Sequence, residues 1–121
     1  MIYHITTHDA AFKAQETGRY VAPSLETEGF IHCSNREQIL KVANAFYRGT
    51  GDLVILCIDD YQLTSALQWE DAAHPNLDAA PDTTDAEQFP HIYGAIGLQA
   101  IVEVVDFPEG EDGFTLPDDL P

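Results

Sequence analysis

The run Leu53–Ile58 is the feature that most constrains the fold of this 121-residue chain. It is continuously apolar and rich in β-branched residues, which predicts a strand. Successive side chains of a strand point to opposite faces, so this strand is apolar on both. Such a strand is stable only where both of its faces are covered. We therefore predict a central strand with further layers packed on each side.

Shorter segments with the same β-branched and aromatic character predict the other strands. They comprise residues 2–6, 29–33, 67–70 and 100–105, and the segment Phe89–Gly94 is equally compact. Residues 19–28 contain Pro23 and several polar residues, which indicates a loop. Residues 71–88 are rich in Ala, Asp, Thr and Pro and predict a second, mobile loop.

Two helices are predicted from their capping residues. Thr7 is a suitable N-cap for a helix that reaches Lys13 or Gln15, and Gly18 would end it. Ser34-Asn35-Arg36-Glu37 matches a capping box, with Ser34 as the cap. A helical apolar stripe from Ile39 to Phe46 follows. The alternation of strands and helices predicts one α+β domain over residues 1–107, and residues 108–121 predict an acidic, exposed tail.

The charge balance excludes several classes of partner. Five basic residues oppose 21 acidic ones, a net charge of −16, and all the basic residues precede residue 49. Such a surface repels nucleic acids and anionic membranes. A small nucleotide stays compatible, because one arginine or a helix N-terminus can hold a phosphate. The sequence leaves the oligomeric state open.

Cellular location follows from hydropathy and cysteine usage. No run approaches the roughly 18 apolar residues of a membrane helix. The first residues lack the basic and apolar regions of a signal peptide. Cys33 and Cys57 lie in apolar runs, so we expect buried, reduced thiols. Together these features predict a cytoplasmic protein.

His32 and Ser34 are the first candidate functional residues. On an extended segment Phe30, His32 and Ser34 share one face, at the point where the second helix begins. An imidazole beside a hydroxyl can act as a base and its nucleophile or as a ligand site. The alternatives are that Ser34 only caps the helix and that His32 is structural.

Glu70, His91 and Tyr93 are further candidates. Glu70 follows Trp69, and desolvation by a neighbouring indole would raise the pKa of the carboxyl. Such a carboxylate suits acid–base work or the stabilisation of a cation. Its alternative is a solvent-facing residue beside a core tryptophan. His91 and Tyr93 share a face if their segment is extended, and the alternative there is a rigid turn.

Metal and dinucleotide motifs are missing from the sequence. The five histidines form no HExxH or His-x-His pair, and the two cysteines form no CxxC. GxGxxG and GxxxxGK[ST] are also absent. We therefore expect no metal, and the cofactor is unknown.

Three segments in order carry a family resemblance: Gly29–Ser34, Trp69-Glu70 and Phe89–Gly94. With the opening Ile2–Ile5 and the strand Asp52–Ile58, they resemble the bacterial family called domain of unknown function 952 (DUF952). The resemblance extends to about Val105. The 71–88 segment and the acidic tail depart from it.

This resemblance implies the ADP-ribosyltransferase-like fold, a split β core with flanking helices. It also implies a cleft that holds NAD or an ADP-ribose-like nucleotide. Enzymes of that superfamily use a first-strand His or Arg, a second-strand Ser or Tyr, and a later Glu. By analogy His4 or His32, Ser34 and Glu70 fill these roles. A fold does not establish a function.

Two functional hypotheses follow, beside a purely structural interpretation that predicts neither ligand binding nor turnover. In the first, the protein is an enzyme: Glu70 and His32 are catalytic, and His4, Ser34, His91 and Tyr93 bind the ligand. In the second, the protein is a non-catalytic ligand-binding or protein-interaction domain that retains the cleft. Turnover of NAD separates the two.

Overall fold

Strand β4 (Leu53–Ile58) lies in the middle of the sheet β1–β4–β8, and all six of its residues are buried. Its neighbours are β1 (Ile2–Thr7) and β8 (Ile101–Asp106), both antiparallel to it. The prediction of a central strand is confirmed. The structure is a computed structural model that describes residues 1–71 and 87–121.

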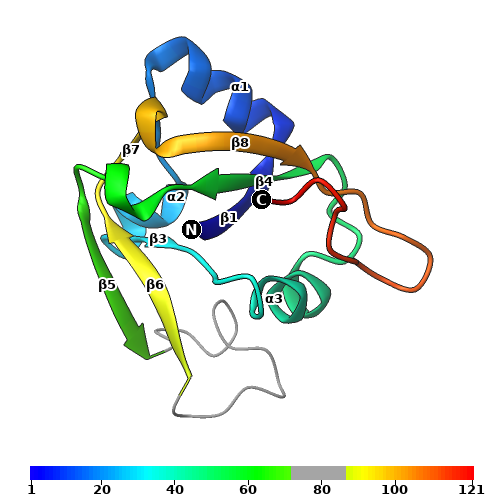
Figure 1. The fold of residues 1–121 in the computed structure, drawn as a ribbon. Coiled ribbons are helices and arrows are strands. Elements are labelled where there is room, and N and C mark those ends of the chain that lie inside the picture. Colours follow the sequence, from blue (N-terminus) through cyan, green and yellow to red (C-terminus); the bar gives the residue numbers. More distant parts are fainter. Residues whose placement is uncertain (72–86) are drawn as a thin grey trace.

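Two hydrophobic clusters cover the two faces of β4. Val54, Leu56 and Ile58 pack in one cluster with Ala11 and Ala14 of α1 (His8–Thr17). The alternate residues of β4 pack in the other, together with residues of α3 (Ile39–Phe46). Figure 1 shows α1 above the sheet and α3 below it. The continuous apolar run is thus explained by a layer on each side.

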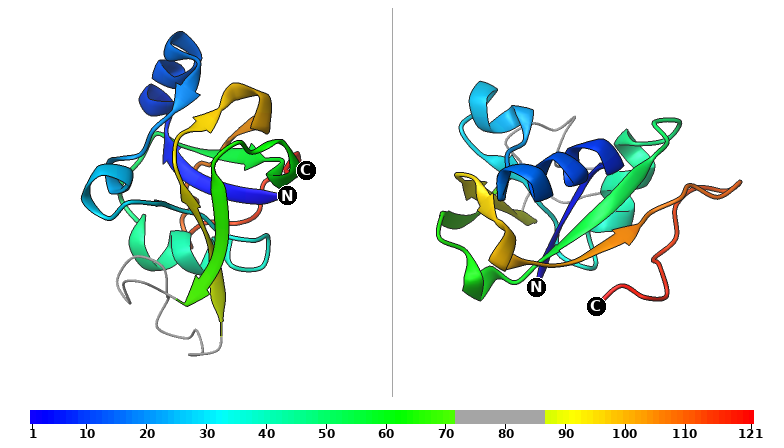
Figure 2. Two further views of the ribbon diagram at one scale, coloured as in Figure 1. Left: turned by 90° about the vertical axis from the view of Figure 1, so that its left-hand side faces the viewer. Right: turned by 90° about the horizontal axis from the view of Figure 1, so that it is seen from above.

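Two smaller antiparallel sheets complete the α+β fold. One joins β2 (Arg19–Tyr20) to β7 (Ile96–Gly97). The other has the order β3–β6–β5, where β3 is Ile31–His32, β6 is Gln88–Tyr93 and β5 is Ala66–Asp71. The short helical turns η1 (Asp60–Gln62) and η2 (Leu98–Ala100) precede β5 and β8. Figure 2 shows these elements from two further sides.

The first helix has the predicted caps. Thr7 Oγ1 accepts a hydrogen bond from Ala10 N at 3.1 Å. Gly18 adopts φ 88°, a left-handed conformation, and its N–H donates to Ala14 O at 2.8 Å. Glycine reaches this conformation without a steric penalty, and it ends the helix.

The predicted capping box at Ser34 is wrong, because α3 begins only at Ile39. Asn35 Oδ1 accepts from Gln38 N at 2.8 Å, and Asn35 N donates to Gln38 Oε1 at 3.0 Å. This reciprocal pair closes a turn directly before α3, and no side chain caps the helix itself, whose N-cap position is Gln38. The backbone of Ser34 instead pairs with Tyr3, through two hydrogen bonds of 2.8 Å. Ser34 therefore joins two sheets and does not cap α3.

The C-terminal segment, which the sequence predicts as an exposed tail, contributes two large apolar side chains to the core. Phe114 and Leu120 are buried in the cluster below the sheet. Asn44 of α3 accepts from Phe114 N at 2.8 Å, and the Tyr3 hydroxyl donates to Pro121 O. Most acidic residues of this segment are exposed, Glu109 bonds to Arg48, and Phe114 and Leu120 complete the core.

Residues 19–28 do not form the predicted loop. They contain β2 and the short helix α2 (Pro23–Thr27), which has a proline in its first position. Proline suits that position because its missing N–H would have no partner in the helix. Most of the predicted 71–88 loop lies outside the described residues. In the described part of the chain, no helix has the length and apolarity needed to cross a membrane.

Both thiols are buried, as predicted. Burial raises the pKa of Cys57 to about 12, so this thiol stays protonated at neutral pH. A protonated buried thiol is a packing residue and a poor nucleophile.

Candidate functional site

His4 projects from β1 into a polar environment below the protein surface. Its side chain Nδ1 lies 2.6 Å from His32 O, and its Nε2 lies 2.8 Å from the Tyr20 hydroxyl. Burial lowers the pKa of His4 to about 4, so the imidazole is neutral at pH 7. Since a carbonyl only accepts, Nδ1 carries the proton and Nε2 is the acceptor. The structure therefore fixes the tautomer of His4.

This tautomer also orients the hydroxyl groups beside it. Because Nε2 of His4 must accept, the Tyr20 hydroxyl donates to it. Tyr20 lies 3.0 Å from Thr6 Oγ1, and the Thr6 hydroxyl is then left to donate to the tyrosine oxygen. Burial raises the pKa of Tyr20 to about 12, which keeps this hydroxyl protonated. The result is an ordered chain of hydrogen bonds between β1 and β2, formed by Thr6, Tyr20 and His4, which we call the relay.

The relay lines a pocket of about 290 Å³ that opens to solvent. Its polar groups come from β1, β2, α2 and β3, and the Tyr47 ring and Leu53 complete its wall. None of the described residues that line it is Lys or Arg. Its polar lining comprises His4, Thr6, Thr7, Tyr20, Ser24, Glu28, His32 and Thr50. The described lining of the pocket thus offers hydroxyl, imidazole and carboxylate groups, without a lysine or arginine side chain.

His32 lies on the wall between this pocket and a smaller cavity. Its Nε2 is 3.0 Å from Glu28 Oε2, and both side chains are 17% exposed. The smaller cavity, about 20 Å³, has room for one water molecule and is lined by His32 and Ser34 among others. His32 therefore lies beside His4 in the larger pocket and beside Ser34 in the smaller cavity.

Glu70, His91 and Tyr93 form a second group on the β5–β6 pair. Glu70 Oε1 accepts from the Tyr93 hydroxyl at 2.5 Å and lies 2.8 Å from His91 Nδ1. Both hydrogen bonds lower the pKa of Glu70, and the bond from Tyr93 has the larger effect. The expectation of a raised pKa is wrong, because Trp69 is 44% exposed and does not desolvate its neighbour. Glu70 is an ionised carboxylate.

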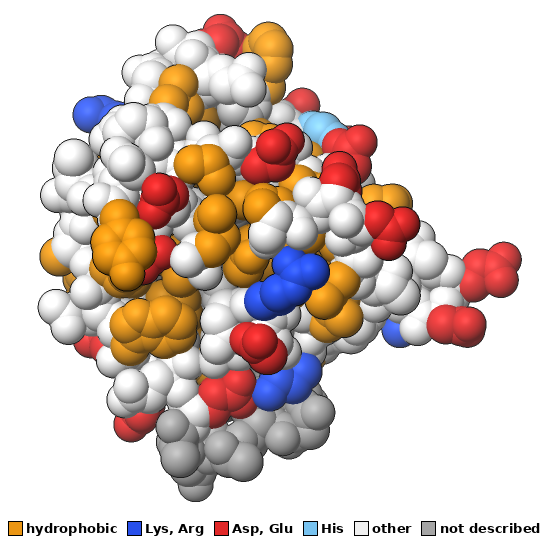
Figure 3. All heavy atoms as spheres, viewed as in Figure 1, with side chains coloured by type: hydrophobic (Ala, Val, Ile, Leu, Met, Phe, Trp, Pro, Cys, Tyr) orange, Lys and Arg blue, Asp and Glu red, His pale blue; other side chains and the backbone are white. Residues whose placement is uncertain are grey.

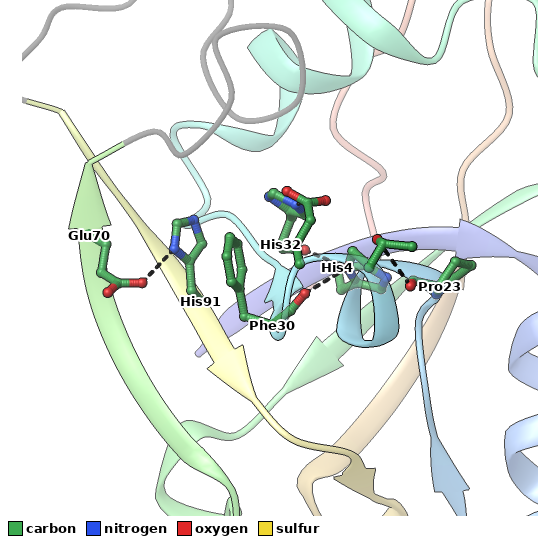
Figure 4. A network of polar contacts seen from close by, with 9 residues as sticks. His4, Pro23, Phe30, His32, Glu70 and His91 are labelled. Atoms are coloured by element: carbon green, nitrogen blue, oxygen red, sulfur yellow. Dashed lines mark hydrogen bonds and ion pairs between the residues drawn. The ribbon is translucent and has the colours of Figure 1, made fainter.

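The Phe30 ring connects the two groups. It stacks on His91 with ring centroids 4.3 Å apart, and its centroid is 4.8 Å from that of His32. Figure 4 shows the Phe30 ring between His91 on one side and His32 and His4 on the other. The His32 and His91 rings also meet edge to face at 5.6 Å. Through Phe30, His32 is connected to His91, Tyr93 and Glu70. Of the candidate residues only His4 and His32 line the larger pocket, so the candidates do not share one cleft.

Sequence reasoning missed Tyr20, Thr6, Glu28 and Phe30 as site residues. Tyr20 and Glu28 lie in the segment mistaken for a loop, and no local motif marks them. Phe30 could have been identified from the sequence, because side chains two residues apart on a strand share a face and Phe30 is two residues from His32. Among the described residues, no group of three or more His, Cys, Asp or Glu side chains is arranged to hold a metal ion.

Comparison with known proteins gives a family model and solved structures of the same fold. Residues 5–104 match the model of a family described as protein of unknown function (DUF952). The crystal structure of protein CC0527 from Caulobacter crescentus is 26% identical, with a TM-score of 0.76, and the match covers 93% of this chain and 90% of that one. Its solution NMR structure gives a TM-score of 0.73 at 26% identity, covering 93% and 89%. No curated protein matches significantly.

Proposed function

Because the chain belongs to the DUF952 family, whose description assigns no activity, we propose its function from the pocket: it binds a small, hydroxyl-rich molecule between His4 and His32. The ligand class that we propose is an NAD- or ADP-ribose-like nucleotide, held by a ribosyl end. The observation that carries the proposal is the ordered relay of Thr6, Tyr20 and His4, which presents fixed hydrogen-bonding groups to the pocket. Ribose hydroxyls both donate and accept, so they complement such a wall.

The size and charge of the pocket define which part of a nucleotide it would hold. A volume of about 290 Å³ is at the lower end of the range for ligand pockets, so one nucleoside-sized end fits and the rest stays outside. Arg36, Lys41 and Arg48 contact other parts of this chain, so they are not aimed at a phosphate here. Three of the five basic residues are thus engaged elsewhere, so we expect the phosphates to contribute less to affinity than the ribosyl end.

Calorimetric titration tests the binding proposal with nicotinamide riboside, NAD and ADP-ribose. We expect saturable binding of a ribosyl compound, with affinities of the nucleoside and the dinucleotide within about tenfold of each other. His32→Ala should weaken binding about tenfold or more, since it removes a polar group from the wall. His8→Gln is the control, because His8 is exposed and bonded to Asp52 and Asp106 away from the pocket. Equal affinity of the His32 variant, or binding of none of the three compounds, would refute the proposal.

Glu70 decides between binding alone and catalysis. In the catalytic form of the proposal, water hydrolyses NAD: the N-glycosidic bond breaks, the electron pair leaves with nicotinamide, and the ribosyl carbon becomes cationic. A water oxygen then bonds to that carbon and loses a proton to solvent, which gives ADP-ribose and nicotinamide. The Glu70 carboxylate would stabilise that charge, and a ligand that extends from the pocket past Phe30 would reach it. Its low pKa supports this electrostatic role and argues against a proton-donor role.

Glu70→Gln is expected to abolish release of nicotinamide and to leave NAD affinity within about threefold of the wild type. The glutamine retains an oxygen for the Tyr93 and His91 hydrogen bonds and loses only the charge. Glu111→Gln, on the exposed part of the C-terminal segment, is the matched control. Chromatographic assay of free nicotinamide measures the result. Unchanged turnover would remove Glu70 from the mechanism, and binding without any turnover in the wild type would favour the non-catalytic alternative.

A further inference from the structure

The outer edge of β8 is an open side of the main sheet. In the described part of the chain, β8 pairs with β4 and with no strand on its other edge. The hydrogen bond from Phe107 N to Leu53 O at 3.0 Å fixes the register of the pair. In this register Val105 bonds to β4, whereas Val104, opposite Leu56, directs its backbone N–H and C=O outward. An open edge of this kind can accept another strand.

An apolar groove lies beside this edge. It has a volume of about 440 Å³ and runs between α1 and β8. Val102 and Val104 are 48% and 38% exposed, although both are strongly apolar. Figure 3 shows hydrophobic side chains gathered over this region, and Figure 2 shows β8 at the outer edge with α1 over the sheet. The residues that form the groove include Ala11, Ala14, Leu56, Leu98, Val102 and Val104.

The charges around the edge specify what can occupy it. Glu103 precedes Val104 in β8, so its side chain points to the opposite face of the sheet. Asp106 ends the strand, where it bonds to His8. The chain as a whole carries −16. A second copy would bring like charges together, which is unfavourable. A strand that carries positive charges would instead be attracted to this edge.

We propose that the open edge of β8 is a docking site for an extended segment of another protein in which apolar and basic residues alternate. Alternate side chains of an added strand point to opposite faces. One set would enter the apolar groove against Val102 and Val104. The other set would lie on the face of Glu103. Main-chain hydrogen bonds to Val104 would supply affinity, and the alternation would supply specificity.

A seven-residue peptide of alternating lysine and valine is the probe, and fluorescence anisotropy measures its binding. Val104→Pro should weaken binding at least tenfold, because proline removes the outward N–H without touching the bonds to β4. Glu103→Lys should weaken it severalfold and reduce its dependence on salt. Glu111→Lys makes the same charge change on the C-terminal segment and should have less effect.

Two measurements on the wild-type chain keep the test independent of how the variants fold. Hydrogen exchange should slow at Val104 when the peptide is added. A peptide of the same composition, with its lysines and valines in two blocks, should bind at least tenfold more weakly. Equal binding of the two peptides, or unchanged exchange at Val104, would overturn the proposal. Sedimentation that shows a dimer dissociated by the peptide would assign the edge to a second copy and would also overturn it.

Discussion

Lowering the pH from 7 to 4.5 is expected to reduce the free energy of unfolding by about 2 kcal/mol through His4 alone. The pKa of His4 is about 4 in the folded protein and 6.5 in an unfolded chain. Below pH 6.5 the imidazole of His4 is protonated in the unfolded state but stays neutral in the folded state. The free energy of unfolding therefore decreases as the pH is lowered. The loss reaches about 3 kcal/mol near pH 4 and then stops, because the folded state is protonated as well.

Urea unfolding at several pH values measures this effect, and His4→Gln isolates it. The slope of stability between pH 6.5 and 4.5 should be much smaller in the variant than in the wild type. Glu70 and Glu109 also have lowered pKa values, but carboxylates lose their contribution below about pH 4.5, outside this window. His8, whose pKa is raised chiefly by Asp106, has the opposite sign, so His8→Gln serves as the control. Identical slopes for wild type and His4→Gln would show that His4 titrates normally.

Phe114→Ala is expected to destabilise the protein by about 3–5 kcal/mol, the cost of removing a buried phenylalanine from a core. Phe114 is 5% exposed and packs on Phe107, with ring centroids 4.7 Å apart. In a domain of this size the loss corresponds to a fall of more than about 10 °C in Tm. Differential scanning calorimetry measures it.

Thr115→Ala is the matched control for Phe114, since Thr115 is its exposed neighbour. We expect a change within about 0.5 kcal/mol for this variant. A small effect of Phe114→Ala on stability would support the exposed tail that the composition of residues 108–121 predicts. A large effect would establish that the acidic segment is an integral part of the fold.

Strong local patterns made much of the fold predictable. The apolar run of β4 indicated its central position, and Thr7 and Gly18 marked the ends of α1 correctly. Each of these signals acts within a few residues. The error at Ser34 and the unforeseen burial of the C-terminal side chains have another origin. Tyr3 pairs with Ser34 across 31 positions, and Asn44 bonds to Phe114 at a separation of 70. Contacts over such distances leave no local pattern.

The candidate site shows the same division. His4, His32 and His91 were found because they lie on strands with clear signals, and the structure aligns them. Tyr20 was missed because β2 lies in the segment that was predicted to be a loop. The pKa of Glu70 was predicted with the wrong sign for a similar reason. Its hydrogen bonds come from His91 and Tyr93 on a separate strand, while the sequence offered only the adjacent Trp69.

Strand β1 gives two neighbouring residues unrelated tasks. Tyr3 faces the lower cluster and holds the C-terminal carbonyl, whereas His4 faces the pocket. Both orientations depend on the pairing of Tyr3 with Cys57 and of His4 with Leu56 in β4. A slip of one residue would exchange the two faces. It would put an imidazole into the core and a phenol into the pocket, so a sheet with β1 misaligned would lose the hydrogen bonds of His4 even if the chain stayed compact. Correct alignment of β1 on β4 therefore determines which side chains line the pocket as well as which side chains pack in the core.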